Sequence, residues 1–229
     1  SIPADCSVIF VNGSYAASDV IYSSCGGRPK LANGGTIKAE TYRQVTLDGQ
    51  GIVGQPFDVY DYCRDLEIYG LGLRRFGNNT GNGVFTFTKD CDGFRVVGNY
   101  IRDCGNGSPV VNDHTFYTAG GDTWSTSPRN FALVHNDIES NVQNNGYGLL
   151  HHYSNSGGHG IHDGEIAYNK VRGTGWAGGV LWEAGYGGGP ANISFHHNDI
   201  QITTNAAGHA GLYFYQNRGI GPASGGLDS

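Results

Sequence analysis

The sequence of 229 residues contains no methionine, few charged residues and no long apolar run. Charged residues make up 15%, with 14 Lys and Arg against 20 Asp and Glu. The formal net charge of −6 and the lack of a basic cluster argue against nucleic acid as a partner, because phosphate binding needs a Lys/Arg surface. No apolar stretch approaches the roughly 18–20 residues of a membrane span, so none is expected.

Glycine is abundant instead, at 39 residues, and Gly, Asn, Ser and Thr take the place of the usual Lys, Glu and Leu. Because glycine costs about 1 kcal/mol in a helix interior, long helices are not expected. Five cysteines without a Cys-x-x-Cys pair do not indicate a zinc site. Two disulfides with one thiol left over, together with four glycosylation sequons, favour a secreted protein; the sequons begin at Asn12, Asn78, Asn106 and Asn192.

One strand-like segment is written repeatedly along the chain, most clearly as NFALVHNDI (130–138) and NISFHHNDI (192–200). Both it and a second, Gly-led segment alternate apolar residues with period two, which is typical of strands. The first segment recurs at 45–52, 66–73, 94–101, 131–138, 165–171 and 193–200. The second lies between its copies, at 57–60, 83–87, 115–119, 148–152, 179–183 and 211–215.

Such repeats predict a coil in which each kind of strand stacks into its own parallel sheet. A propeller blade would need four strands, and only two are clear in each repeat. One inward column is then expected to contain Leu47, Ile68, Val96, Leu133, Ile166 and Phe195. A second is expected to contain the apolar residues that close the copies, Ile52, Leu73, Ile101, Ile138, Val171 and Ile200.

Asparagine occupies one position of the repeated segment in four copies, at Asn99, Asn136, Asn169 and Asn198. Stacked Asn side chains hydrogen-bond along a column and satisfy turn backbone that would otherwise be buried without a partner. The first two copies carry Gln50 and Leu71 at this place, so the Asn ladder is expected to begin at the third.

On these residues the chain resembles the right-handed parallel β-helix proteins of the pectate-lyase-like superfamily, over roughly residues 36–216. The right-handed sense comes from this resemblance and from the general crossover preference. We expect an all-β, single-domain solenoid of about six to seven coils with an Asn ladder. Residues 1–35 are expected to form an N-terminal cap and 36–229 the β-helix, which is either capped differently or cut short at its C-terminal end.

The resemblance is to a fold and not to one enzyme family. GGHGI (157–161) matches a short piece of the polygalacturonase pattern, but the paired Asp residues are missing. Signatures of pectate lyases, pectin esterases and alginate epimerases are absent. Uronates usually require Lys, Arg or Ca²⁺, and only Lys89 and Arg218 lie near the Gly-led strands. A neutral or weakly charged glycan, and hydrolysis over lyase chemistry, are therefore favoured.

The cysteines fit this architecture. Cys6 and Cys25 would form a bridge that staples the cap. Cys63 and Cys91 occupy equivalent places on successive turns, within disulfide range, and would form a second bridge. Cys104 would then be the free thiol.

The Gly-led strands are predicted to carry the ligand site. If Val84, Leu149, Val180 and Leu212 point inward, an aromatic row faces outward, and such rows suit the apolar faces of sugar rings. The alternative is that the long loops cover this face and that it has no function of its own. The expected substrate-binding residues are Phe85, Phe87, Tyr117, Tyr213, Tyr215, Trp124 and Arg218.

Catalysis is assigned to His152 and Glu183, which this alignment makes neighbours on consecutive turns. A Glu on an apolar, partly covered sheet can act as general acid, and Asp122 or Asp58 could offer the second carboxylate that glycoside hydrolysis requires. The alternative is a His–Glu pair that only satisfies itself. The chain is thus expected to be a secreted glycoside hydrolase acting on a polysaccharide. A polysaccharide lyase, or a non-catalytic glycan-binding or surface repeat module, remains the alternative.

A histidine cluster lies in LLHHYSNSGGHGIHD (149–163). Because alternate strand residues face opposite ways, His151 and His152 cannot share one ion with His159 and His162. No metal ligands and no cofactor are therefore predicted; a transition metal is disfavoured and Ca²⁺ stays open.

Overall fold

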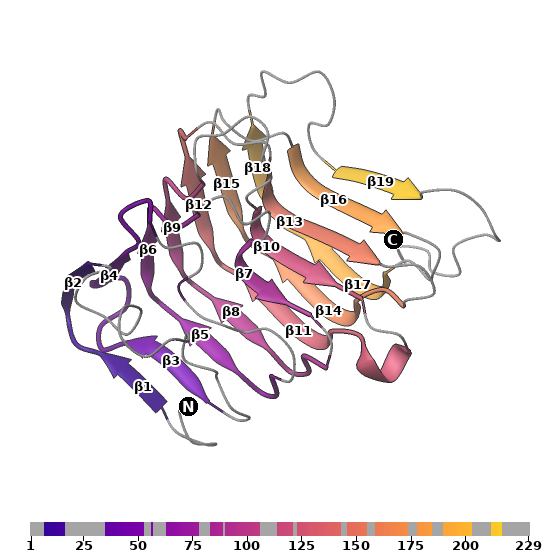
Figure 1. Cartoon of the computed structure of the whole chain (residues 1–229), viewed down its shortest axis with the longest axis horizontal. Coiled ribbons are helices and arrows are strands. Elements are labelled where there is room, and N and C mark those ends of the chain that lie inside the picture. Colours follow the sequence, from indigo (N-terminus) through magenta and orange to yellow (C-terminus); the bar gives the residue numbers. More distant parts are fainter. Residues whose placement is uncertain are drawn as a thin grey trace.

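The computed structural model is an all-β solenoid in which three parallel sheets run along a common axis (Figure 1). It describes residues 7–16, 35–52, 56, 63–77, 83–88, 90–105, 114–120, 123–142, 146–154, 159–173, 178–184, 190–202 and 212–216. The turns succeed one another from the indigo to the yellow end of Figure 1. From residue 67 onward each turn passes through sheet 1, sheet 2 and then sheet 3, whereas the two turns before it have described strands in sheets 1 and 2 only. The predicted parallel solenoid is confirmed.

The strands of each sheet follow the order of the turns. Sheet 1 consists of β1 (Ser7–Phe10), β3 (Thr36–Ala39), β5 (Glu67–Tyr69), β8 (Arg95–Val97), β11 (Arg129–Val134), β14 (His162–Ala167) and β17 (Ala191–His196). Sheet 2 consists of β2 (Gly13–Ala16), β4 (Val45–Asp48), β6 (Gly72–Arg74), β9 (Tyr100–Arg102), β12 (Asp137–Ser140), β15 (Lys170–Gly173) and β18 (Asp199–Ile202). Sheet 3 consists of β7 (Gly83–Phe87), β10 (His114–Ala119), β13 (Tyr147–Ser154), β16 (Gly178–Ala184) and β19 (Leu212–Gln216).

Sheet 3 is the shortest, with five described strands, which is slightly fewer than the six to seven coils predicted from the sequence. At the other end, β1 and β2 come from within the segment expected to be a cap, and they are the first strands of sheets 1 and 2. A short 3₁₀ helix, η1 (Trp124–Thr126), lies between β10 and β11. The predicted strand at 57–60 lies outside the described residues.

The first repeat copy was misaligned in the sequence prediction. Leu47 pairs with Leu73 in sheet 2, whereas Ile37 pairs with Ile68 in sheet 1. Leu47 therefore takes the place predicted for Ile52, which is 66% exposed. From Ile68 onward both predicted inward columns are confirmed by the strand register.

The Asn ladder is present and begins at the third copy, as predicted. Asn136 Oδ1 accepts hydrogen bonds from the backbone N–H and the side-chain amide of Asn99, at 3.1 and 3.2 Å. Asn169 and Asn198 repeat this pattern one and two turns further on. At the start of the ladder, the backbone N–H of Leu71 donates to Asn99 Oδ1. The ladder thus ties together the corner between sheets 1 and 2.

The residue before each ladder Asn has a positive φ, which bends the chain from sheet 1 into sheet 2. Gly98 supplies this conformation at no steric cost, but His135, Tyr168 and His197 adopt it as well, with φ of 58°, 56° and 53°. Their rings stack in sequence, with centroids 4.9 Å apart in both steps. His135 and His197 therefore have a structural role in the turn between sheets 1 and 2.

Cys63 and Cys91 do lie on neighbouring turns, but the described chain contains them as thiols, so the predicted bridge is wrong. The two thiols hydrogen-bond to each other, and this contact together with burial raises the pKa of Cys63. Burial raises the pKa of Cys104 to about 12. Cys6 and Cys25 lie outside the described residues.

Candidate functional site

The aromatic residues expected to face solvent on sheet 3 are inside the solenoid. Phe85 and Phe87 are both 0% exposed. Phe85 stacks on Phe116 at 5.3 Å, and Phe87 stacks on Phe94 of sheet 1 at 4.0 Å. The prediction that Phe85 and Phe87 form a sugar platform is therefore wrong, because these rings build the core.

The positions that alternate with these phenylalanines are also covered. Val84 and Thr86 on β7 are 3% and 1% exposed, and Thr115 on β10 and Leu149 on β13 are both 0% exposed. Over these strands sheet 3 is buried on both faces, which agrees with the alternative that the face is covered. An open aromatic row is absent from this described part of the sheet.

His152 and Glu183 are not partners on consecutive turns. The register pairs His152 with Trp182, and Glu183 with Tyr153, after an irregularity in β13 between Tyr147 and Leu150. That one-position shift places His152 and Glu183 in opposite sets of alternating residues. The predicted catalytic pairing is therefore wrong.

His152 has a structural environment. Its side chain is buried, with Nδ1 2.8 Å from Thr118 Oγ1. Nε2 accepts a hydrogen bond from the backbone N–H of Ile161 at 3.4 Å, so the proton of the neutral ring belongs on Nδ1. With both nitrogens engaged inside the core, His152 has no access to a polymer.

The other predicted site residues are scattered or lie beyond the described chain. Tyr117 is half-buried on β10, Tyr213 and Tyr215 lie on β19, and Trp124 lies in η1. Asp58, Asp122 and Arg218 are outside the described residues. Glu183, on β16, lies in register between Tyr153 on β13 and Tyr215 on β19.

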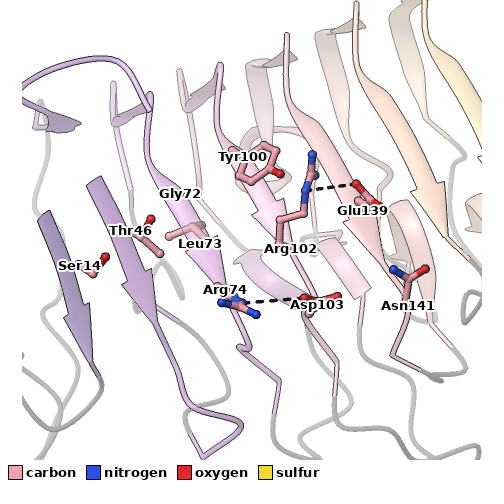
Figure 2. A pocket seen from close by; sticks show the side chains of 10 residues that line it. All are labelled: Ser14, Thr46, Gly72, Leu73, Arg74, Tyr100, Arg102, Asp103, Glu139 and Asn141. Carbon is pink, nitrogen blue, oxygen red and sulfur yellow. Dashed lines mark ion pairs between the residues drawn. The ribbon is translucent and has the colours of Figure 1, made fainter. Parts of the chain in front are cut away.

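A groove of about 460 Å³ lies instead on the outer face of sheet 2 (Figure 2). It crosses five neighbouring strands, from β2 through β4, β6 and β9 to β12. It is lined by Ser14, Thr46, Gly72, Leu73, Arg74, Tyr100, Arg102, Asp103, Glu139 and Asn141. Hydroxyl, amide, guanidinium and carboxylate groups thus surround one exposed aromatic ring.

Tyr100 is the aromatic side chain of this groove, and it is 39% exposed. The guanidinium of Arg102 lies 3.4 Å from the centroid of its ring. Arg102 is held in turn by β12, through hydrogen bonds to the carbonyl and carboxylate of Asp137 at 3.0 and 3.1 Å. On β6, the residue paired with Tyr100 is Gly72, which contributes no side chain. Arg102 therefore fixes the ring at the edge of the groove.

The charged groups of the groove are arranged as ion pairs. Arg102 Nε lies 3.3 Å from Glu139 Oε2, and Arg74 Nε lies 3.9 Å from Asp103 Oδ2 (Figure 2). The side chain of Arg102 is 14% exposed, whereas that of Arg74 is 54% exposed. Arg102 is thus a fixed structural partner, and Arg74 is reachable from solvent.

The sequence predicted a site on sheet 3, whereas the groove lies on sheet 2. The signal for the groove is the outward alternation of the strand after each ladder Asn, which gives Tyr100 and Arg102 on one turn and Asp137 and Glu139 on the next. This polar and aromatic set follows directly from the period of two, but only once the strand boundary is known.

Within the described residues, no group of three or more His, Cys, Asp or Glu side chains is arranged to hold a metal ion. His162 and Asp163 form a pair, with Nδ1 2.6 Å from Oδ2. A hydrogen bond from Asn192 and the contact with His162 hold the pKa of Asp163 below its usual range. These contacts link the strand starts of β14 and β17.

Comparison with protein-family models, with curated proteins and with solved structures returned no match. Among the described residues there is no helix long and apolar enough to cross a membrane.

Proposed function

We propose that the chain is an extracellular polysaccharide-binding β-solenoid of the pectate-lyase-like superfamily. The observation that carries the proposal is the groove on sheet 2, which is lined by one exposed tyrosine and by several polar side chains. The four sequons favour the extracellular location.

The groove has the two components that sugar recognition requires. The part of the Tyr100 ring that Arg102 leaves exposed offers an apolar surface on which the C–H face of a pyranose packs. Thr46, Arg74, Asp103 and Asn141 offer donors and acceptors for its hydroxyl groups. Because Arg102 packs on the ring and is held by β12, the ring is already ordered before a ligand binds, which lowers the entropic cost of binding.

We expect Tyr100→Ala to weaken polysaccharide binding by about 10–100-fold, because it removes the aromatic anchor of the groove. Tyr100→Phe keeps the ring and should bind within about threefold of the unmodified protein. Dissociation constants from calorimetry on a panel of soluble plant, algal and bacterial polysaccharides give the comparison.

Tyr69→Ala is the matched control, since Tyr69 is another exposed tyrosine, 36% exposed, on sheet 1 and outside the groove. It should leave the dissociation constant unchanged. If the Tyr100→Ala protein keeps its circular dichroism spectrum and binds with the same dissociation constant as the unmodified protein, the groove is not the binding site.

Cleavage of the bound polysaccharide is a second candidate function, favoured by one placement. Glu183 occupies a register position between Tyr153 and Tyr215 on adjacent turns of sheet 3. A Glu in such a row is a candidate general acid or base for glycosidic bond cleavage. In the groove of sheet 2, by contrast, both carboxylates are ion-paired with arginine.

If Glu183 is the acid or base, Glu183→Gln should lower the release of reducing ends by about 10²–10⁴-fold, while Glu67→Gln on sheet 1 should not. Ultraviolet absorbance of unsaturated products separates a lyase from a hydrolase. An unchanged rate in the Glu183→Gln protein rules out this assignment.

A further inference from the structure

The fixed charges of the sheet 2 groove balance. Its two guanidinium groups, Arg74 and Arg102, face two carboxylates, Asp103 and Glu139. A polymer that carries a negative charge on every unit would meet as many carboxylates as guanidinium groups, so it would gain little electrostatic energy. The charge pattern therefore favours an uncharged ligand.

Arg74 and Asp103 are also placed to read hydroxyl groups. At 3.9 Å their ion pair is too long for a hydrogen bond, and their side chains are 54% and 35% exposed. A donor and an acceptor that lie side by side and face solvent match two adjacent hydroxyls of a sugar ring, one accepting from Arg74 and the other donating to Asp103.

The dimensions of the groove indicate the length of the ligand segment that it binds. Its lining residues come from five neighbouring strands of sheet 2, β2, β4, β6, β9 and β12. At about 4.8 Å per strand spacing this is roughly 19 Å, which corresponds to about four sugar rings of roughly 5 Å each. The long direction of the groove crosses the strands and so follows the solenoid axis.

We infer that this groove takes an uncharged polysaccharide segment of about four sugar rings that lies along the solenoid axis, with Arg74 and Asp103 binding adjacent hydroxyls of one ring. The inference rests on the proposed function and specifies its ligand. Tyr100, which pairs with Gly72, lies across the groove from that pair (Figure 2).

The test uses the polysaccharides of the panel that bind, sorted by charge, with neutral oligosaccharides of about two to six units prepared from the neutral ones. Affinity should rise with length and level off near four units. Raising NaCl from about 0.05 M to about 0.5 M should change neutral-ligand affinity less than about twofold, since no net charge is screened. Uronate and sulfated polymers should bind at least about tenfold more weakly than neutral ones.

Two substitutions locate the hydroxyl contacts. Arg74→Gln and Asp103→Asn should each weaken neutral-ligand binding by about 5–20-fold, because each removes a hydrogen bond to a charged group. Asparagine suits position 103, where φ is 50°, since Asn tolerates this backbone conformation. Arg95→Gln, at an exposed arginine on sheet 1, is the matched control and should have no effect.

The outcomes separate this inference from the proposed function. Salt-sensitive binding of an acidic polymer that is lost in Tyr100→Ala would overturn the uncharged ligand and keep the polysaccharide-binding groove. Neutral binding that is indifferent to chain length, or to Arg74 and Asp103, would overturn the axial placement. If no polymer on the panel binds, the proposed function fails and this inference fails with it.

Discussion

Asn136→Ala should lower the free energy of unfolding by about 2–4 kcal/mol, measured by urea denaturation monitored by circular dichroism. Asn136 is 1% exposed and lies in the interior of the ladder. Its Oδ1 accepts from the backbone N–H of Asn99, and its Nδ2 donates to the carbonyl of Val96 at 2.9 Å. Truncation leaves the N–H of Asn99 buried without that acceptor, and a buried unsatisfied donor costs about 1–3 kcal/mol.

Asn198→Ala is the matched control for the ladder. Asn198 makes the same kinds of bond, to Asn169 and to the carbonyl of Ile166, but on the last described turn, where it is only part-buried. Water can replace its amide there, so the loss of stability should be less than half of that for Asn136→Ala. Equal losses at the two positions would mean that the ladder contributes through local turn propensity and not through buried hydrogen bonds.

The ladder was predictable because the sequence repeats both its polar residue and its apolar neighbours. Four copies place Asn two residues before an apolar closing residue, and a buried Asn column is the physical solution that this pattern permits. The first turn was not predictable in the same way. Leu47 and Ile52 are both apolar and both follow strand-like residues, so composition does not say which one enters the closing column.

In sheet 3, the period-two alternation mispredicted which residues face outward, for a different reason. Strands buried on both faces have apolar residues at successive positions, so alternation no longer separates inside from outside. Val84 and Phe85 are adjacent on β7 and are 3% and 0% exposed. The irregularity in β13 then shifted the register by one. Gly148 lies within it, but the sequence prediction placed this glycine only at the start of the strand. Because of these two features, the predictions of an outward aromatic face and of a His152–Glu183 pair were both wrong.

The groove of sheet 2 shows what the sequence could have indicated. Copies that end in Ile continue with polar residues, as in Tyr100-Ile101-Arg102 and Asp137-Ile138-Glu139. With the closing residue inward, its neighbours must face outward and stack on the next turn. The ion pairs of Arg102 follow from that stacking, but their exact partners require the coordinates.

Among the described glycines, Gly164 is the position at which a single methyl group should be most disruptive to the core. A Cβ at this position would lie 2.0 Å from Cε1 and 2.3 Å from Cζ of Phe131. Phe131 is 3% exposed and stacks on Phe94 at 5.2 Å, and Phe94 stacks on Phe87 in turn, so the ring cannot retreat without displacing the others. Phe131 fills the space that the missing side chain leaves.

Gly164→Ala should therefore lower the free energy of unfolding by about 3 kcal/mol, at the upper end of the usual cost of overpacking. The double variant Gly164→Ala/Phe131→Leu should recover about 1–2 kcal/mol relative to the value expected from adding the two single changes. Urea denaturation of all four proteins closes the cycle. Strictly additive changes in the free energy of unfolding would mean that the Phe131 ring does not occupy the space over Gly164. The stack of phenylalanine rings from β7 to β11 would then not depend on the glycine on β14.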